Sequence, residues 1–249
     1  METRTELSAI GEFGLIKRIA EKFPLVLSSS IKGIGDDAAV VDTEGKKLLI
    51  STDLLMEGVH FDLAYTPLRH LGYKAVAVNV SDIAAMNGIP KQITVSLGLS
   101  NRFSVEAIDE LYEGIKIACE EYNIDLIGGD TSASRGGLAI SITVLGTADV
   151  HQIVYRSNAK AGDIICVTGD LGAAFMGLQV LEREKQVFLA NPDMQPELSD
   201  KDYVVERQLK PTARMDVIHE LRALDLIPTA MIDVSDGLAA ELLHICKNS

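Results

Sequence analysis

Basic residues are scarce in this sequence. Its 249 residues include 23 lysines and arginines against 36 aspartates and glutamates, which gives a formal net charge of −13. No cluster rich in lysine or arginine occurs along the chain. A nucleic-acid backbone would be repelled over most of the surface, so we expect no nucleic-acid partner. A small phosphate compound is compatible with this charge only where cations mediate the contact.

Cysteines and long apolar runs are also few. The cysteines are odd in number and widely spaced, and each has apolar neighbours as a small core residue would: Cys119, Cys166 and Cys246. This usage fits a reducing cytoplasm. Residues 1–23 carry charges throughout, and no apolar run reaches the roughly 18 residues that a membrane-spanning helix needs. We expect a cytoplasmic protein without a membrane partner.

Several catalytic and nucleotide-binding motifs are missing. The pattern G-x-x-x-x-G-K-[ST] does not occur, which excludes a P-loop, and no G-x-G-x-x-G with a following acidic residue supports a Rossmann site. No Ser-His-Asp or activated-cysteine arrangement is visible either. Nucleotide binding, if present, must use another arrangement of residues.

The sequence does contain alternating strand and helix patterns. Hydrophobic residues make up 47% and charged residues 24%, as in a folded globular protein. Apolar spacing predicts helices over 12–23, 68–87, 104–122, 172–185, 203–210 and 213–224, and one that begins at Gly237. Strands are predicted over 46–52, 91–99, 138–150, 163–169 and 229–234, and a surface excursion over 186–201.

This order of elements predicts a mixed α/β or α+β fold. The segment 150–162 leaves the long strand that ends near residue 150, so we place a domain boundary there. The expected domains are 1–150 and 151–249. Ser104 is a plausible N-cap for the helix over 104–122, whose apolar residues form one stripe.

Aspartates recur where apolar segments end. "LIGGDTS" places Asp130 directly behind two glycines, and "LLISTD" ends at Asp53. The wider set is Asp36, Asp37, Asp53, Asp82, Asp130, Asp233 and Asp236. Strand ends that converge on one edge would crowd these carboxylates, which raises their pKa values unless divalent cations intervene. Mg²⁺ prefers oxygen ligands and bridges to substrate phosphates, so the set predicts a magnesium site.

Each aspartate alone also has a structural interpretation. An Asp beside Gly or Ser is a common turn residue or helix N-cap, and Asp170 in "ICVTGD" fits that role best. The glycine-rich stretches "GIGDD", "IGGD" and "TGDLG" place backbone N–H groups where a phosphate oxygen could approach, although each is also a good turn.

A family resemblance rests on motifs that run in order over nearly the whole chain. They are "GEFGLI" (11–16), "GIGDDAAVV" (33–41), "STDLLMEGVHF" (51–61), "KAVAVNVSDIAAMNGIP" (74–90), "LIGGDTS" (126–132), "RSNAKAGDIICVTGDLG" (156–172) and "IDVSDGLAAEL" (232–242). Together they closely resemble the thiamine-monophosphate kinase family of the aminoimidazole-ribonucleotide (AIR) synthetase superfamily. The combination of "GIGDD", "STD" with "GVHF", the "NVSDIAAM" stretch and "SDGL" distinguishes this family from its superfamily relatives.

The resemblance implies ATP-dependent phosphorylation of thiamine monophosphate to thiamine diphosphate, with several Mg²⁺ ions. It also implies a two-domain AIR-synthetase-like fold, in which the N-terminal mixed sheet pairs into a barrel in a homodimer and an α/β domain follows. A phosphate acceptor is already ionised at neutral pH. Catalysis then needs alignment and charge neutralisation rather than a general base.

The resemblance also implies roles for individual residues. Magnesium ligands are implied at Asp36, Ser51, Thr52, Asp53, Asp82, Asp130, Asp233 and Asp236. ATP contacts are implied at Tyr112, Gly129, Asp130, Arg156 and Ser235. Contact with thiamine phosphate is implied at His60.

Other interpretations of these residues remain open. From the residues alone, His60 reads as a surface or packing histidine, Tyr112 as a core residue of its helix and Arg156 as a linker arginine. Asn158 and Ala161 stand where the family usually has Gly and Pro, and Asn87 where Gly or an acidic residue is frequent. Family members continue past the point where this sequence ends, so we expect an incomplete second domain.

Two alternative functions follow from the same residues. A superfamily synthetase with another acceptor would use the same acidic cluster and ATP. An inactive metal- and nucleotide-binding fragment would bind Mg²⁺ and ATP without turnover.

Overall fold

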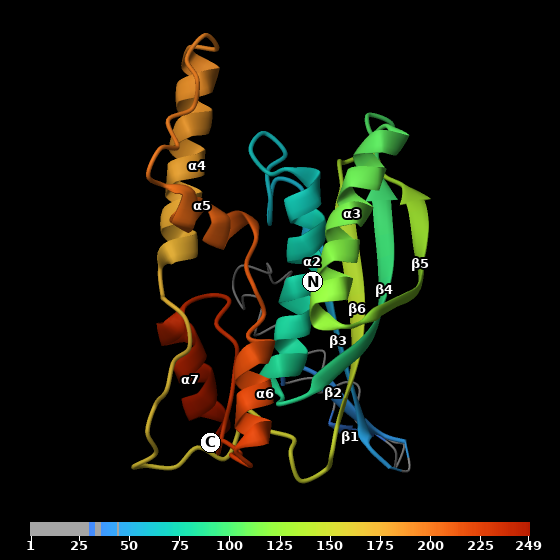
Figure 1. The fold of residues 1–249 in the computed structure, drawn as a ribbon, viewed down its shortest axis with the longest axis vertical. Helices are drawn as coiled ribbons and strands as arrows, with labels where there is room; N and C mark the ends of the chain where they lie inside the picture. Colours follow the sequence, from blue (N-terminus) through green and yellow to red (C-terminus); the bar gives the residue numbers. More distant parts are fainter. Residues whose placement is uncertain (1–29, 33–35, 44) are drawn as a thin grey trace, which may run out of the picture.

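The computed structural model describes residues 30–32, 36–43 and 45–249, and its main feature is one mixed β-sheet (Figure 1). The strands are β1 (Ser30–Lys32), β2 (Ala39–Asp42), β3 (Lys47–Met56), β4 (Ile89–Leu99), β5 (Asp125–Ala133) and β6 (Ala139–Ala148). They lie in the order β1-β2-β3-β6-β4-β5, and only the β4–β5 pair is parallel.

Helices complete the fold. They are α2 (Leu68–Ala85), α3 (Val105–Tyr122), α4 (Ala173–Ala190), α5 (Asp202–Leu209), α6 (Met215–Ala223) and α7 (Leu238–Asn248). Helices α2 and α3 lie along the sheet, and α4–α7 lie beyond α2 on the side away from β5 (Figure 1). The mixed α/β class that the sequence predicts is confirmed.

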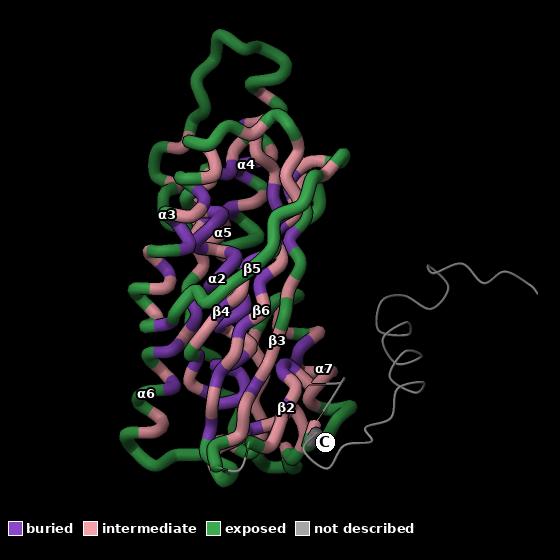
Figure 2. The backbone as a smooth tube through the Cα atoms, turned by 90° about the vertical axis from the view of Figure 1, so that its right-hand side faces the viewer, coloured by how far each residue is buried: buried purple, intermediate pink, exposed green. Residues whose placement is uncertain are grey.

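The sheet buries one of its faces. Along β6 every second residue is buried, and Ile140, Ile142 and Val144 are fully enclosed. Successive side chains of a strand point to opposite faces, so this alternation marks a face covered by α2 and a more open face rich in Thr and Ser. Strand β5 is exposed along its whole length (Figure 2). The core therefore lies between the sheet and the two helices.

Helices α2 and α3 pack with their backbones in close contact. A Cβ atom added to Gly72 would lie 2.0 Å from the carbonyl oxygen of Leu111, and one added to Gly114 would lie 1.9 Å from that of Arg69. Only glycine permits this approach. Most residues of α2 are buried because the helix has the sheet on one side and α3 on the other.

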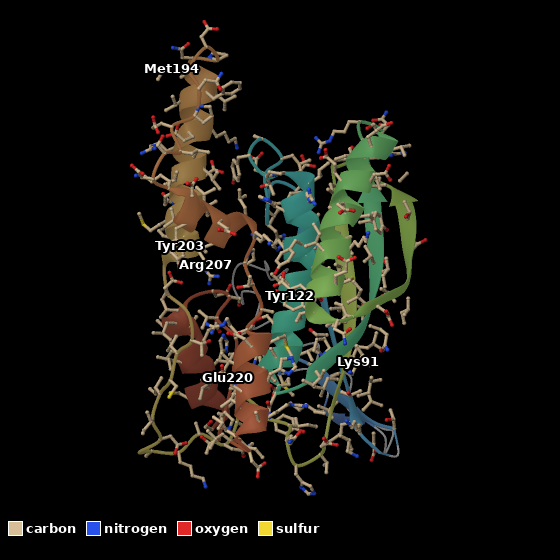
Figure 3. All side chains as sticks on the ribbon, viewed as in Figure 1. Lys91, Tyr122, Met194, Tyr203, Arg207 and Glu220 are labelled. Atoms are coloured by element: carbon tan, nitrogen blue, oxygen red, sulfur yellow. The ribbon has the colours of Figure 1, made fainter. Side chains whose placement is uncertain are left out.

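The predicted start of α3 is confirmed. The Ser104 hydroxyl accepts a hydrogen bond from the N–H of Ala107 at 3.3 Å, as an N-cap does. At the other end of α3, the Tyr122 hydroxyl lies 2.9 Å from the Tyr73 hydroxyl and accepts from the N–H of Ala213 at 2.9 Å. This tyrosine, labelled in Figure 3, ties both helices to the segment that leads into α6.

The strands predicted over 163–169 and 229–234 are wrong. Neither segment has strand conformation, and Ile164 and Ile165 are 89% and 68% exposed. A strand needs the backbone groups of a neighbouring strand, and the described sheet places none beside these segments. Isolated hydrogen bonds hold them instead, such as the one from the N–H of Met231 to the carbonyl of Tyr155 at 3.1 Å.

Other expectations differ in smaller ways. Helix α4 continues to Ala190, so residues 186–190 belong to it and the surface excursion begins at Asn191. Of the three cysteines only Cys119 is partly buried, whereas Cys166 and Cys246 are exposed, and all three are free. The helix predicted over 12–23 lies outside the described residues. Within the described ranges, no helix is both long and apolar enough to cross a membrane.

The substitution Gly114→Ala tests the close contact between α2 and α3. Alanine ordinarily stabilises a helix interior relative to glycine by roughly 0.5–1 kcal/mol. Here its Cβ would collide with the carbonyl of Arg69, so we expect the free energy of unfolding to fall by about 1–3 kcal/mol in urea denaturation. Gly136→Ala, with no atom within 4 Å of the added Cβ, is the control. A Gly114→Ala protein as stable as the parent would refute the contact.

Candidate metal and phosphate site

Three carboxylates from distant parts of the chain meet on the helix-covered side of the sheet. One oxygen each from Asp37, Asp82 and Asp233 lies within 4.8 Å of the other two. Asp37 precedes β2, Asp82 lies near the end of α2, and Asp233 precedes α7. We call these three residues the acidic triad.

Strand β3 and helix α2 supply the neighbours of the triad. The Ser51 hydroxyl donates to a carboxylate oxygen of Asp82 at 2.5 Å. Two residues along β3, the N–H of Asp53 donates to the side-chain oxygen of Asn79 at 3.2 Å. Asn79 and Asp82 are three residues apart, which puts them on one face of α2. The packing of α2 on the sheet thus determines where these groups meet.

Asp233 is attached to α2 through a second serine. The Ser81 hydroxyl donates to a carboxylate oxygen of Asp233 at 2.8 Å. This bond joins residues 152 positions apart in the sequence. The segment before α7 is thereby held against the end of α2, which brings Asp233 to Asp82.

Crowding and burial favour protonated carboxyl groups in this region. Burial, and then the charges of Asp233 and Asp53, raise the pKa of Asp82 to about 8. Burial, and then the charge of Asp37, raise the pKa of Asp233 to about 6. Burial also raises the pKa of Asp53, and the neighbouring His60 offsets part of that rise. Ionisation of all these carboxylates would therefore place more negative charge here than the surroundings neutralise.

Arg156 supplies positive charge to one end of the triad. Its guanidinium donates to both carboxylate oxygens of Asp37, at 2.9 and 2.6 Å, in a bidentate pair. Asp36 lies next to this pair. The ammonium of Lys32 is 3.4 Å from its carboxylate, and the backbone N–H of Arg156 donates to that carboxylate at 3.4 Å. Burial nevertheless raises the pKa of Asp36.

The donor set of the triad fits a hard divalent cation. All of its ligand atoms are carboxylate oxygens, which Mg²⁺ prefers, and two of the three groups have raised pKa values. A cation of charge +2 would relieve the repulsion that raises those values. The resemblance implied Asp82 and Asp233 as metal ligands, and the structure places beside them Asp37, a member of the acidic set noted in the sequence.

Three of the predicted ATP-contacting residues lie together elsewhere on the sheet. Tyr112, Gly129 and Asp130 line a shallow pocket of about 330 Å³ between α3 and β5, together with Val95, Leu126, Gly128 and Thr131. Asp53 pairs with Ile142, Ile142 with Val95, and Val95 with Gly129. Three strand spacings therefore separate β3 from β5, or roughly 14 Å.

Thr52 lies apart from the triad. It alternates with Ser51 and Asp53 on β3, so its side chain points to the opposite face of the sheet. There its hydroxyl donates to the carbonyl of Ile142 and accepts from Thr143, both at 3.0 Å.

The remaining predicted residues are exposed. His60 accepts a hydrogen bond from the N–H of Met56 at 3.0 Å through Nδ1. The side chains of Ser235 and Asp236 lie at the surface, while their backbone N–H groups donate to Glu241. The carboxylate of Asp170 accepts a hydrogen bond from the Tyr203 hydroxyl and lies 3.7 Å from the Arg207 guanidinium. Both partners belong to α5 and are labelled in Figure 3, so Asp170 holds its turn against this helix.

The resemblance assigned no role to four residues near the site. Asp37 belonged to the acidic set that predicted a magnesium site, but the resemblance gave the metal role to its neighbour Asp36. Asn79 and Ser81 lie in the "NVSD" stretch, where helical spacing from Asp82 was an available signal. Glu241 had no signal that distinguished it from a solvated helix residue.

Comparison with known proteins agrees with this geometry. Residues 35–148 match the family described as AIR synthase related protein, N-terminal domain. A thiamine-monophosphate kinase of Aquifex aeolicus is 38% identical over 244 residues, which cover 98% of this chain and 72% of the relative. One of Bacillus subtilis is 40% identical over 240 residues, covering 96% and 70%.

A solved structure gives the same result. AaThiL, complexed with AMPPCP and TMP, superimposes with a TM-score of 0.82 at 35% identity, covering 99% of this chain and 72% of that one. On sequence identity, coverage and fold, this chain belongs to the thiamine-monophosphate kinase family.

Proposed function

We propose that this protein transfers the terminal phosphoryl group of ATP to thiamine monophosphate and so forms thiamine diphosphate. The observation that carries the proposal is the acidic triad, which gathers Asp37, Asp82 and Asp233 within 4.8 Å in a chain of the kinase family. Family membership and the AMPPCP and TMP bound to AaThiL support ATP as the phosphoryl donor and thiamine monophosphate as its acceptor.

Alignment and charge balance account for the reaction. The acceptor is a phosphate oxygen that is already ionised, so no side chain must remove its proton. The enzyme has to hold two anionic phosphates in line and exclude water. Arg156, at the edge of the triad, is placed to share its positive charge between Asp37 and a phosphate oxygen.

We propose that several magnesium ions are held by Asp36, Ser51, Thr52, Asp53, Asp82, Asp130, Asp233 and Asp236, with Asp37 added. The contacts of Ser51 with Asp82, and of Asp53 with Asn79, support the central members of this set. Thr52, whose side chain lies on the opposite face of the sheet, and Asp130, on β5, lie farther from the triad. When bound, magnesium would neutralise phosphate charge and polarise the transferred group.

We assign ATP contacts to Tyr112, Gly129, Asp130, Arg156 and Ser235. The pocket between α3 and β5 would hold the part of the nucleotide distant from the reacting phosphate, and the triad would hold the phosphates. An extended molecule is needed to cover the roughly 14 Å between β5 and β3. His60, beside Asp53, is proposed to contact thiamine phosphate.

We further propose a homodimer and two domains. Strand β5 is an exposed edge of the sheet, and the open face of the sheet carries Thr and Ser. An exposed edge of this kind can pair with a strand of a second copy of the chain. The proposed domains, 1–150 and 151–249, are supported by the position of all described strands in the first and of α4–α7 in the second. We propose a cytoplasmic location, with which three free cysteines agree.

The substitution Asp233→Asn tests the triad in catalysis. Loss of one ligand charge should lower the rate of thiamine diphosphate formation from ATP, Mg²⁺ and thiamine monophosphate by about 100-fold. Asp193→Asn is the matched control, because Asp193 is exposed next to Met194 at the far end of α4 (Figure 3). Equal rates for both variants would exclude the triad. Binding of Mg²⁺ and ATP without turnover in the parent would instead favour a non-catalytic fragment.

The pH dependence of stability tests the raised pKa values. Between about pH 5 and pH 6 the folded, magnesium-free protein retains protons on both Asp82 and Asp233, whose pKa values are about 8 and about 6, and between about pH 6 and pH 8 it retains the proton of Asp82 alone. The unfolded chain has already released them. Its free energy of unfolding should therefore fall as pH rises, by up to about 1.4 kcal/mol per pH unit for each retained proton.

Urea denaturation at several pH values in EDTA measures this slope. Asp82→Asn should flatten it and Asp193→Asn should leave it unchanged, whereas added Mg²⁺ should reduce it by displacing the protons. A slope that Asp82→Asn does not alter would mean that Asp82 is not the group that titrates.

A further inference from the structure

Glu241 is a buried carboxylate to which the proposed reaction gives no role. It is 5% exposed and is the only buried residue of α7 within the described chain. No ion pair of Glu241 occurs among the described residues. A glutamate in such a position needs hydrogen-bond donors from its surroundings.

The donors come from the segment before the helix. Oε1 of Glu241 accepts from the N–H of Ser235 at 3.3 Å and from the N–H of Asp236 at 2.9 Å. The side chain thus reaches back across the first turn of α7, past Gly237, whose φ of 119° few other residues adopt. A negative charge at this end of a helix is also favoured by the helix dipole.

This arrangement leaves the usual capping residues uncommitted. Ser and Asp are preferred N-cap residues, and Ser235 and Asp236 directly precede Gly237, yet α7 has no side-chain N-cap hydrogen bond. Glu241 satisfies the backbone donors instead. The Ser235 hydroxyl and the Asp236 carboxylate therefore stay at the surface while their backbone is held in place.

The position of Glu241 is unfavourable for a residue that serves stability alone. Its hydrogen bonds to the N–H groups of Ser235 and Asp236 place another carboxylate close in the chain to Asp233, a member of a cluster that is already crowded.

We propose that Glu241 is a positioning residue, which fixes the backbone of Ser235 and Asp236 so that their side chains face Mg²⁺ and ATP. This inference rests on the proposed function of the site. In this role Glu241 would act through Ser235 and Asp236, whose N–H groups donate to it, and not by contact with the substrates or the metal. It extends the set of residues that control nucleotide binding into α7.

A buried glutamate in α4 provides a matched control. Glu184 is 7% exposed and accepts from the N–H of Glu197 at 2.8 Å, which also fixes a loop to a helix. That loop follows Asn191 and lies at the end of α4 remote from α7 (Figure 1). Substitution of Glu184 should therefore reproduce the structural cost of losing a buried glutamate without affecting the site.

The experiment compares Glu241→Met, Glu241→Gln and Glu184→Met with the parent. Binding of AMPPCP in the presence of Mg²⁺ is measured by calorimetry, stability by urea denaturation, and KM for ATP and kcat by steady-state kinetics. Glu241→Met retains size but removes the acceptor, and should weaken AMPPCP binding by about tenfold or more. Glu241→Gln retains an acceptor oxygen and should stay within about threefold of the parent.

The outcomes separate positioning from simple stabilisation. Weaker AMPPCP binding in Glu241→Met, rescue in Glu241→Gln and parental binding in Glu184→Met would support the proposal. Parental binding by Glu241→Met would overturn it, as would equal losses in Glu241→Met and Glu184→Met. Should Glu241→Met fail to fold, Glu241→Ala takes its place under the same criteria.

Failure of the proposed function would be visible separately. A parent protein that binds AMPPCP with Mg²⁺ but makes no thiamine diphosphate would refute the reaction, and the binding comparison would still decide the role of Glu241. A parent protein that does not bind AMPPCP would overturn the role of Glu241 itself.

Discussion

Repulsion between buried carboxylates is the constraint around which this fold is organised. One carboxylate oxygen from each of Asp37, Asp82 and Asp233 lies within 4.8 Å of the other two. Burial favours the protonated form of Asp82 and Asp233 by raising their pKa values. Among the residues that the structure describes, Asp37 alone of the three receives a strong cationic partner, the guanidinium of Arg156. Full ionisation would leave unbalanced negative charge at this place, which the proposed divalent ion would neutralise.

The rest of the structure holds these groups together against their repulsion. The glycines at the contact between α2 and α3 let the two helices approach closely, with α2 seated on the sheet. That position sets Asp82 beside Ser51, and Ser81 beside Asp233. Packing at the core and geometry at the site are consequently parts of the same arrangement, although the core residues are apolar and the site is acidic.

Much of this arrangement could be predicted from the sequence. Periodicity located α2, α3 and the central strands, and Ser104 was identified as a cap because its signal is local. The strands expected over 163–169 and 229–234 failed because strand formation depends on a neighbour, which no local pattern reveals. The family motifs predicted that Asp82 and Asp233 belong to one site. The bidentate pair of Asp37 and Arg156 was not predicted, because it joins residues more than a hundred positions apart. The burial of Glu241 was not predicted either, because it depends on contacts across one turn of helix.

The separation of these contacts along the chain has a consequence for biosynthesis. Arg156 pairs with a carboxylate 119 positions earlier, and Asp233 with a serine 152 positions earlier. During translation from the N-terminus, Asp37 and Asp82 emerge long before Arg156 and Asp233 are available. The nascent polypeptide can thus complete its sheet before Asp233 joins the other two carboxylates.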